Sequence, residues 1–134
     1  MPVIASCHCG DTKIELAQKP THAHECNCSF CARAGAIWGF VARADMTLTT
    51  QTNDTIYSAS GGLNQHHFCA RCGMQTWGDS PDWAQNFNID GTPKDGVDPD
   101  SVPTARSYYV NLRLIDGLDW TSIHLEKVDG RNNW

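Results

Sequence analysis

The cysteines of this chain are grouped closely enough to act as metal ligands. All seven lie in three short motifs, a Cys-x-Cys at 7–9, a Cys-x-Cys-x-x-Cys at 26–31 and a Cys-x-x-Cys at 69–72. In extended chain a Cys-x-Cys pair places both sulfurs on one side, and a Cys-x-x-Cys pair brackets a tight turn. Thiolates are soft donors, so the spacing predicts zinc, although an iron centre also accepts four sulfurs.

The number of cysteines indicates two sites of different kinds. Two pairs that are distant in sequence complete a closed, structural four-thiolate site, which staples the start of the chain to its middle. These ligands are Cys7, Cys9, Cys69 and Cys72. The remaining triplet leaves a tetrahedral ion one ligand short, which is the pattern of a site that can bind a further ligand and so could support chemistry. The triplet is Cys26, Cys28 and Cys31. The alternative is a closed Cys₃His structural site with His24, two residues upstream, as the fourth ligand.

The compartment expected for this chain favours metal binding over disulfides. Closely spaced cysteines in a reducing compartment are more often metal ligands than disulfide partners. Seven is an odd number, so disulfides alone would leave one thiol unpaired. The first residues lack a charged n-region and a long apolar h-region, and no apolar stretch approaches the roughly 18 residues of a membrane span. We therefore expect a reduced, cytoplasmic protein.

Composition points to a small-molecule partner. Asp and Glu number 15 against 10 Lys and Arg, which gives a formal net charge of −5, and no basic run occurs. This balance argues against nucleic acid or an anionic membrane as a partner. The length of 134 residues suits a single domain, 1–134.

Short β-like segments separated by Gly- or Asp-bearing turns dominate the chain. The expected strands are 12–16, 37–42, 47–49, 55–58, 65–68, 74–77, 86–89, 109–114 and 123–128, and 29–34 is the one expected helical turn. Short turns favour antiparallel pairing. The Gly-, Pro- and Asp-rich stretch 91–105 has no periodicity, and we expect a solvated loop there, with a lid as the alternative.

A polar pair on one predicted strand could face a site. In the segment 110–114, period-two alternation would point three aliphatic side chains to one face and Asn111 and Arg113 to the other.

The chain resembles the glutathione-dependent formaldehyde-activating enzyme family. The shared motifs are Cys-x-Cys-Gly at 7–10, Cys-x-Cys-x-x-Cys at 26–31, Cys-x-x-Cys-Gly at 69–73 and Val-Asn-x-Arg-x-x-Asp-Gly at 110–117. The resemblance implies a mainly β, zinc-bound fold of the β-tent type. It also implies that the outer cysteine pairs bind a structural zinc and the middle triplet a labile, functional zinc, so two Zn²⁺ per chain.

The resemblance further implies a carbon–sulfur lyase activity on an adduct such as S-hydroxymethylglutathione, formed from glutathione and formaldehyde. A thiol bound at the open position of the triplet site would lose its proton and attack an aldehyde carbon, and the lyase direction reverses this step. Asn111 or Arg113 would donate to the developing alkoxide or bind a carboxylate of the thiol. The alternative is a noncatalytic zinc scaffold that binds another protein, as in relatives such as centromere protein V.

Overall fold

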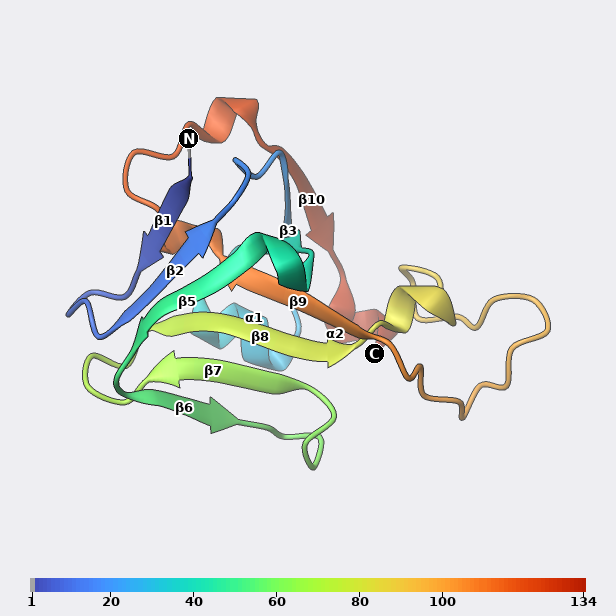
Figure 1. The fold of residues 1–134 in the computed structure, drawn as a ribbon. Helices are drawn as coiled ribbons and strands as arrows, with labels where there is room; N and C mark the ends of the chain where they lie inside the picture. Colours follow the sequence, from blue (N-terminus) through green and yellow to red (C-terminus); the bar gives the residue numbers. More distant parts are fainter. Residues whose placement is uncertain (1) are drawn as a thin grey trace.

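Two β-sheets form the body of the protein (Figure 1), as described by a computed structural model for residues 2–134. The smaller sheet has the order β1-β2-β5, all antiparallel, with β1 at Val3–Ser6, β2 at Thr12–Leu16 and β5 at Met46–Gln51. The larger sheet has seven strands in the order β10-β3-β4-β9-β8-β7-β6. They are β3 (His22–Cys26), β4 (Trp38–Val41), β6 (Asp54–Tyr57), β7 (Gln65–Cys69), β8 (Gln75–Pro81), β9 (Arg106–Asn111) and β10 (His124–Val128). The predicted mainly β fold is confirmed.

The helices are short. They are α1 (Ser29–Ala34), α2 (Gly130–Asn133) and the 3₁₀ turns η1 (Arg43–Asp45), η2 (Trp83–Gln85), η3 (Leu112–Leu114) and η4 (Trp120–Ser122). The prediction of a helical turn at 29–34 is confirmed by α1, which ends at Gly35 in the left-handed conformation, where the Gly35 N–H donates to the Cys31 carbonyl. Within the described part of the chain, each helix is too short and too polar to cross a membrane.

The main apolar core joins the two sheets. Ile14, Leu16 and Met46 from the smaller sheet cluster with Trp77 and Val110 from the larger one, and all five are buried. Alternation along β2 explains this, because its first, third and fifth residues are buried and the two between them are more exposed.

A second, smaller cluster lies beneath α1 on the larger sheet. Trp38 of β4 and Tyr109 of β9 are buried there, and Phe30 and Cys31 of α1 pack against them. Val110 belongs to the main core and its neighbour Tyr109 to this second cluster, as expected when successive side chains of a strand point to opposite faces.

Most of the predicted strands occur, with local differences. Residues 86–89 form no strand and contribute only an isolated bridge between Phe87 and Pro93. The strand predicted over 109–114 stops at Asn111, because the Asn111 side chain accepts the Arg113 N–H at 3.2 Å and turns the chain into η3. As a result Asn111 is buried and Arg113 is exposed, so the predicted polar face does not form.

Two strands were not predicted, and one pair is parallel. β1 and β3 were missed, and β3 pairs in parallel with β10, with Cys26 opposite Val128. Antiparallel pairing was expected from short turns, but β3 and β10 are separated by most of the chain, so no turn constrains their direction. This pairing brings the C-terminal segment beside the second cysteine motif.

The segment 91–105 has no helix or strand and projects from the body in Figure 1, in yellow to orange. Its backbone makes local turns, with the Asn88 N–H donating to the Thr92 carbonyl at 2.8 Å and the Ser101 N–H to the Asp98 carbonyl at 3.0 Å. The expected loop is therefore present.

Candidate metal centres

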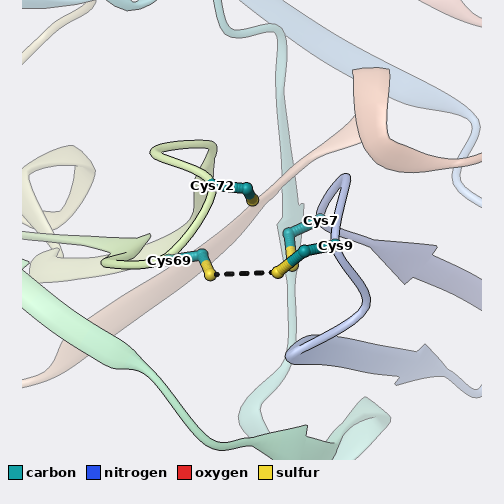
Figure 2. A group of neighbouring side chains, drawn as sticks. All are labelled: Cys7, Cys9, Cys69 and Cys72. Atoms are coloured by element: carbon teal, nitrogen blue, oxygen red, sulfur yellow. Dashed lines mark hydrogen bonds between the residues drawn. The ribbon is translucent and has the colours of Figure 1, made fainter.

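Two loops from distant parts of the sequence bring four cysteines together. The first pair lies in the turn between β1 and β2, and the second pair occupies the end of β7 and the turn that follows it. The four are Cys7, Cys9, Cys69 and Cys72, whose sulfurs all lie within 4.8 Å of one another. In Figure 2 their side chains point toward a common centre.

The spacing of these sulfurs matches a metal site and excludes disulfides. The Cys7 and Cys9 sulfurs are 3.7 Å apart, and the Cys9 and Cys69 sulfurs are 3.6 Å apart. A disulfide needs about 2.05 Å. Zn–S bonds of about 2.3 Å place the sulfurs of a tetrahedral site about 3.8 Å apart. The group is therefore able to hold a tetrahedral metal ion.

Backbone and ionic contacts support the two turns that carry this group. The Thr12 N–H donates to the Cys7 sulfur at 3.2 Å, and the Gly73 N–H closes the second turn on the Cys69 carbonyl at 2.7 Å. Gly73 has a φ of +79°, which a side chain would strain. Arg71 reaches across to Asp11 at 3.4 Å, which ties the second turn to the first.

The second group of cysteines lies where β3 passes into α1. Cys26 ends β3, Cys28 is the N-cap of α1, and Cys31 lies within the helix, with all three sulfurs within 4.8 Å of one another. Because only two residues separate the end of β3 from the start of α1, the three ligands are local in sequence. Among residues 2–134, no further His, Cys, Asp or Glu joins either group.

Each sulfur of the triplet accepts an N–H group. The Cys28 N–H donates to Cys26 at 3.4 Å, and the Cys31 N–H donates to Cys28 at 3.3 Å. The indole N–H of Trp38 donates to Cys31 at 3.3 Å. Such donors favour the thiolate over the thiol. The site is therefore prepared for the ionised ligands that a soft metal requires.

The triplet thiols also influence one another. The Cys31 thiol lowers the pKa of Cys26 to about 5, burial opposes this shift, and the N–H groups of Cys28 and Gly130 add to it. Conversely, the hydrogen bond to Cys26 and burial raise the pKa of Cys31. Without metal, the pKa of Cys26 therefore lies below that of Cys31.

His24 does not complete the triplet in this structure. Its Nε2 lies 3.5 Å from Oε2 of Glu126 on the neighbouring strand, and its ring packs edge-on against Phe40 with ring centroids 4.9 Å apart. His24 is not among the residues whose ligand atoms converge with the three sulfurs. The arrangement therefore favours an open three-cysteine site over a closed Cys₃His site.

The two polar residues named from the sequence lie at the end of β9, and their environments differ. The Asn111 amide contacts only backbone, because its Nδ2 donates to the Gln75 carbonyl at 3.0 Å and its Oδ1 accepts from the Ile37 and Arg113 N–H groups at 3.4 and 3.2 Å. Ile37 immediately precedes Trp38, so this amide holds the start of β4. Arg113 is exposed.

Sequence reasoning missed two contacts of the triplet. Neither Trp38 nor Gly130 was connected with the triplet from the sequence, yet the Trp38 indole N–H donates to Cys31 and a Cβ at Gly130 would lie 2.7 Å from the Cys26 sulfur. Neither has a motif, because both reach the site through strand pairing rather than sequence proximity.

An aromatic group borders the triplet. Phe30 lies between two of the ligands in sequence and stacks on His66 with ring centroids 3.8 Å apart. The Tyr109 hydroxyl lies 3.5 Å from Nδ1 of His66, and burial, together with the Cys31 thiol, raises the pKa of Tyr109. This side of the site is therefore walled by rings.

Comparison with known proteins gives a family match and similar solved structures. Residues 2–111 match the family described as glutathione-dependent formaldehyde-activating enzyme. The fold is similar to the crystal structure of a Rhodobacter sphaeroides protein, with a TM-score of 0.61 and 25% sequence identity over 92% of this chain and 99% of that chain. The family match includes all seven cysteines and both groups that they form. This chain therefore belongs to the glutathione-dependent formaldehyde-activating enzyme family.

Proposed function

We propose that this protein is a zinc-dependent carbon–sulfur lyase-type enzyme that acts on a thiol–aldehyde adduct. The observation that carries the proposal is the triplet of Cys26, Cys28 and Cys31, whose sulfurs converge without a fourth protein ligand in residues 2–134. The family name supports glutathione and formaldehyde as the thiol and the aldehyde, with S-hydroxymethylglutathione as the adduct.

The donor sets fit zinc, which prefers thiolates in a tetrahedral arrangement. Cys7, Cys9, Cys69 and Cys72 would hold a structural zinc, and the triplet would hold a second, labile one. Bound at the triplet, zinc would supply Lewis acidity that favours the ionised form of a coordinated thiol.

The chain's own groups then position the reaction. The N–H groups of Cys28, Cys31 and Trp38 orient the three ligand sulfurs and stabilise their charge. Asn111 fixes the start of β4 through the Ile37 N–H, and so helps to place Trp38. We assign to Arg113, which is exposed, the binding of a carboxylate of the thiol.

In the synthetic direction, the sulfur of the thiol attacks the aldehyde carbon, the carbonyl oxygen takes a proton, and a hemithioacetal forms. In the lyase direction, the hydroxyl loses its proton, the carbon–sulfur bond breaks, and the electron pair returns to sulfur. We further propose that the protein acts as one domain, 1–134, in the cytoplasm.

A second candidate function is a noncatalytic zinc scaffold that binds another protein. The observation in its favour is the exposure of two aromatic residues near the triplet, Phe40 at 53% and Tyr57 at 51%. In that case both metals serve folding, and adduct exchange would be no faster with the protein than without it.

The deciding experiment combines zinc counting with exchange kinetics. We expect two zinc ions per wild-type chain and faster exchange of formaldehyde with glutathione, followed by NMR. Cys28→Ser should lose about one zinc and the acceleration yet remain folded, because serine is a good N-cap residue and can preserve the cap of α1.

Cys72→Ser is the matched comparison, since it removes one thiol from the other group. It should unfold or aggregate the domain, because that group joins loops from distant parts of the chain. Equal rates of exchange with and without wild-type protein would refute the proposed enzymatic activity. Two variants that are equally unfolded would refute the division of the sites.

A further inference from the structure

The last residues of the chain fold back onto the second cysteine group. We call Asp129–Trp134 the C-terminal hook; it comprises the N-cap Asp129, α2 and Trp134. The parallel register of β10 on β3 pairs Val128 with Cys26, so the chain enters the hook at the level of the first triplet ligand. Figure 1 shows α2 beside the end of the larger sheet.

The hook holds the residue between two ligands. Asn27 lies between Cys26 and Cys28, and its amide Nδ2 donates to Oδ1 of Asp129 at 2.9 Å. Its Oδ1 accepts the Arg131 N–H at 2.9 Å, and its carbonyl accepts from Nε of Arg131 at 3.1 Å. Together these bonds fix both the side chain and the backbone of Asn27.

The hook also packs directly against a ligand sulfur. A Cβ built on Gly130 would lie 2.7 Å from Sγ of Cys26 and 3.0 Å from two atoms of the Trp134 ring. Real side-chain atoms do not approach so closely, so an alanine must displace the thiol, the indole or the helix. Gly130 does not have a positive φ, so space rather than backbone conformation requires glycine here.

The other side of the hook contacts the long loop. A Cβ on Gly91 would clash with the Asn133 carbonyl oxygen, so the start of the 91–105 loop rests on α2. A shallow hollow of about 200 Å³ beside Cys26 is lined by both β3 and the start of the hook, including Asn27 and Asp129. The hook therefore lies between the loop and the triplet.

We propose that the C-terminal hook is a positioning element of the Cys26/Cys28/Cys31 metal site, in which Gly130 sets the place of the Cys26 sulfur and Asn27 transmits the position of the hook to the ligand backbone. The proposal rests on the proposed function only in requiring a metal at the triplet. The family match ends at residue 111, so the hook lies outside the matched region.

The physical reason is preorganisation. Ligands held in place before binding lose little conformational entropy when the metal arrives, and groups that orient ligands from behind typically change metal affinity by about 10- to 100-fold when removed. Three ligands within six residues fix little of the fold by themselves, so their mutual position must come from elements that pack on them. The hook is such an element, contributed from the far end of the sequence.

The test measures the affinity of each zinc in the full chain by competition with a chromophoric chelator. Gly130→Ala should lower the affinity for the second zinc by about tenfold or more and leave the affinity for the first unchanged. Asn27→Ala should act in the same direction, since it removes the two side-chain hydrogen bonds to the hook without adding volume. It tests the proposal even if Gly130→Ala fails to fold.

Leu16→Ala is the control for general destabilisation, because Leu16 is buried in the smaller sheet. It should lower the thermal midpoint and leave the affinity of the second zinc unchanged. Wild-type affinity in both Gly130→Ala and Asn27→Ala would overturn the positioning role, as would an equal loss in Leu16→Ala. A wild-type chain that binds only one zinc would instead overturn the proposed function and the hook with it. Two bound zinc ions without accelerated exchange would overturn the proposed enzymatic activity and leave the positioning role of the hook unaffected.

Discussion

Trp38→Phe tests whether the indole N–H sustains the triplet site. Trp38 is 4% exposed, its Nε1 donates to the Cys31 sulfur at 3.3 Å, and its ring packs edge-on against Tyr109 with centroids 4.9 Å apart. Phenylalanine keeps an aromatic ring at this position but has no N–H. The substitution therefore removes a donor from one ligand while most of the packing remains.

The size of the effect follows from the charge of the acceptor. Hydrogen bonds to charged groups contribute about 1.5–3 kcal/mol. At about 1.36 kcal/mol per factor of ten, the second zinc should bind about 10- to 150-fold more weakly in Trp38→Phe. The affinity of the first zinc should not change, because its ligands are Cys7, Cys9, Cys69 and Cys72.

Trp77→Phe is a matched control. Trp77 is 9% exposed and its Nε1 also donates at 3.3 Å, but to Oδ1 of Asp54 rather than to a cysteine. Both variants lose one indole N–H and similar volume, so both should be less stable in urea. Chelator competition should show weaker binding of the second zinc only in Trp38→Phe. Equal zinc affinities in the two variants would refute the assignment of Trp38 to the site.

Two further predictions concern stability and pH. Asp54→Ala should lower the free energy of unfolding by about 1–3 kcal/mol in urea, because it leaves the buried Nδ1 of His67 and the indole N–H of Trp77 without their acceptor; unchanged stability would contradict it. In protein stripped of metal, the Cys31 thiol lowers the pKa of Cys26 from 9.0 to about 5. Because a lowered pKa keeps the thiolate at lower pH, alkylation of Cys26 by iodoacetamide, followed by peptide mass spectrometry, should decline only as the pH falls through about 5. A midpoint near 9 would disprove the assignment.

The parts of the site that were predictable from the sequence are those set by short-range spacing. A Cys-x-Cys or Cys-x-x-Cys motif determines by itself that two sulfurs can meet one ion, so both cysteine groups could be foreseen. Trp38 and Gly130 could not, because β4 and β10 bring them to the triplet through strand pairing. Parallel pairing of β3 with β10 has no turn signal in the sequence.

The polar face predicted at the end of β9 does not form, and the reason is local. Alternation assumes that a strand continues, but asparagine can bond nearby backbone and so compete with the ladder. Asn111 does this by accepting the Arg113 N–H, and the chain turns into η3. The Asn111 amide, which was predicted from the sequence to be a catalytic donor, thus makes its hydrogen bonds to backbone groups.

The two cysteine groups differ most in how much of the chain each one spans. The four-cysteine group joins residues 60 positions apart, as in the contact between Cys9 and Cys69, so a metal there closes a long loop and adds directly to fold stability. The triplet spans only Cys26 to Cys31, so a metal there closes only a very short loop. We therefore expect that an ion bound there can leave without unfolding the protein. Retention of that ion then depends on contacts from outside the triplet, from Trp38 on β4 and from the C-terminal hook. We thus predict that the second metal is labile in an intact fold because its ligands are close in sequence, and that these two contacts set how labile it is.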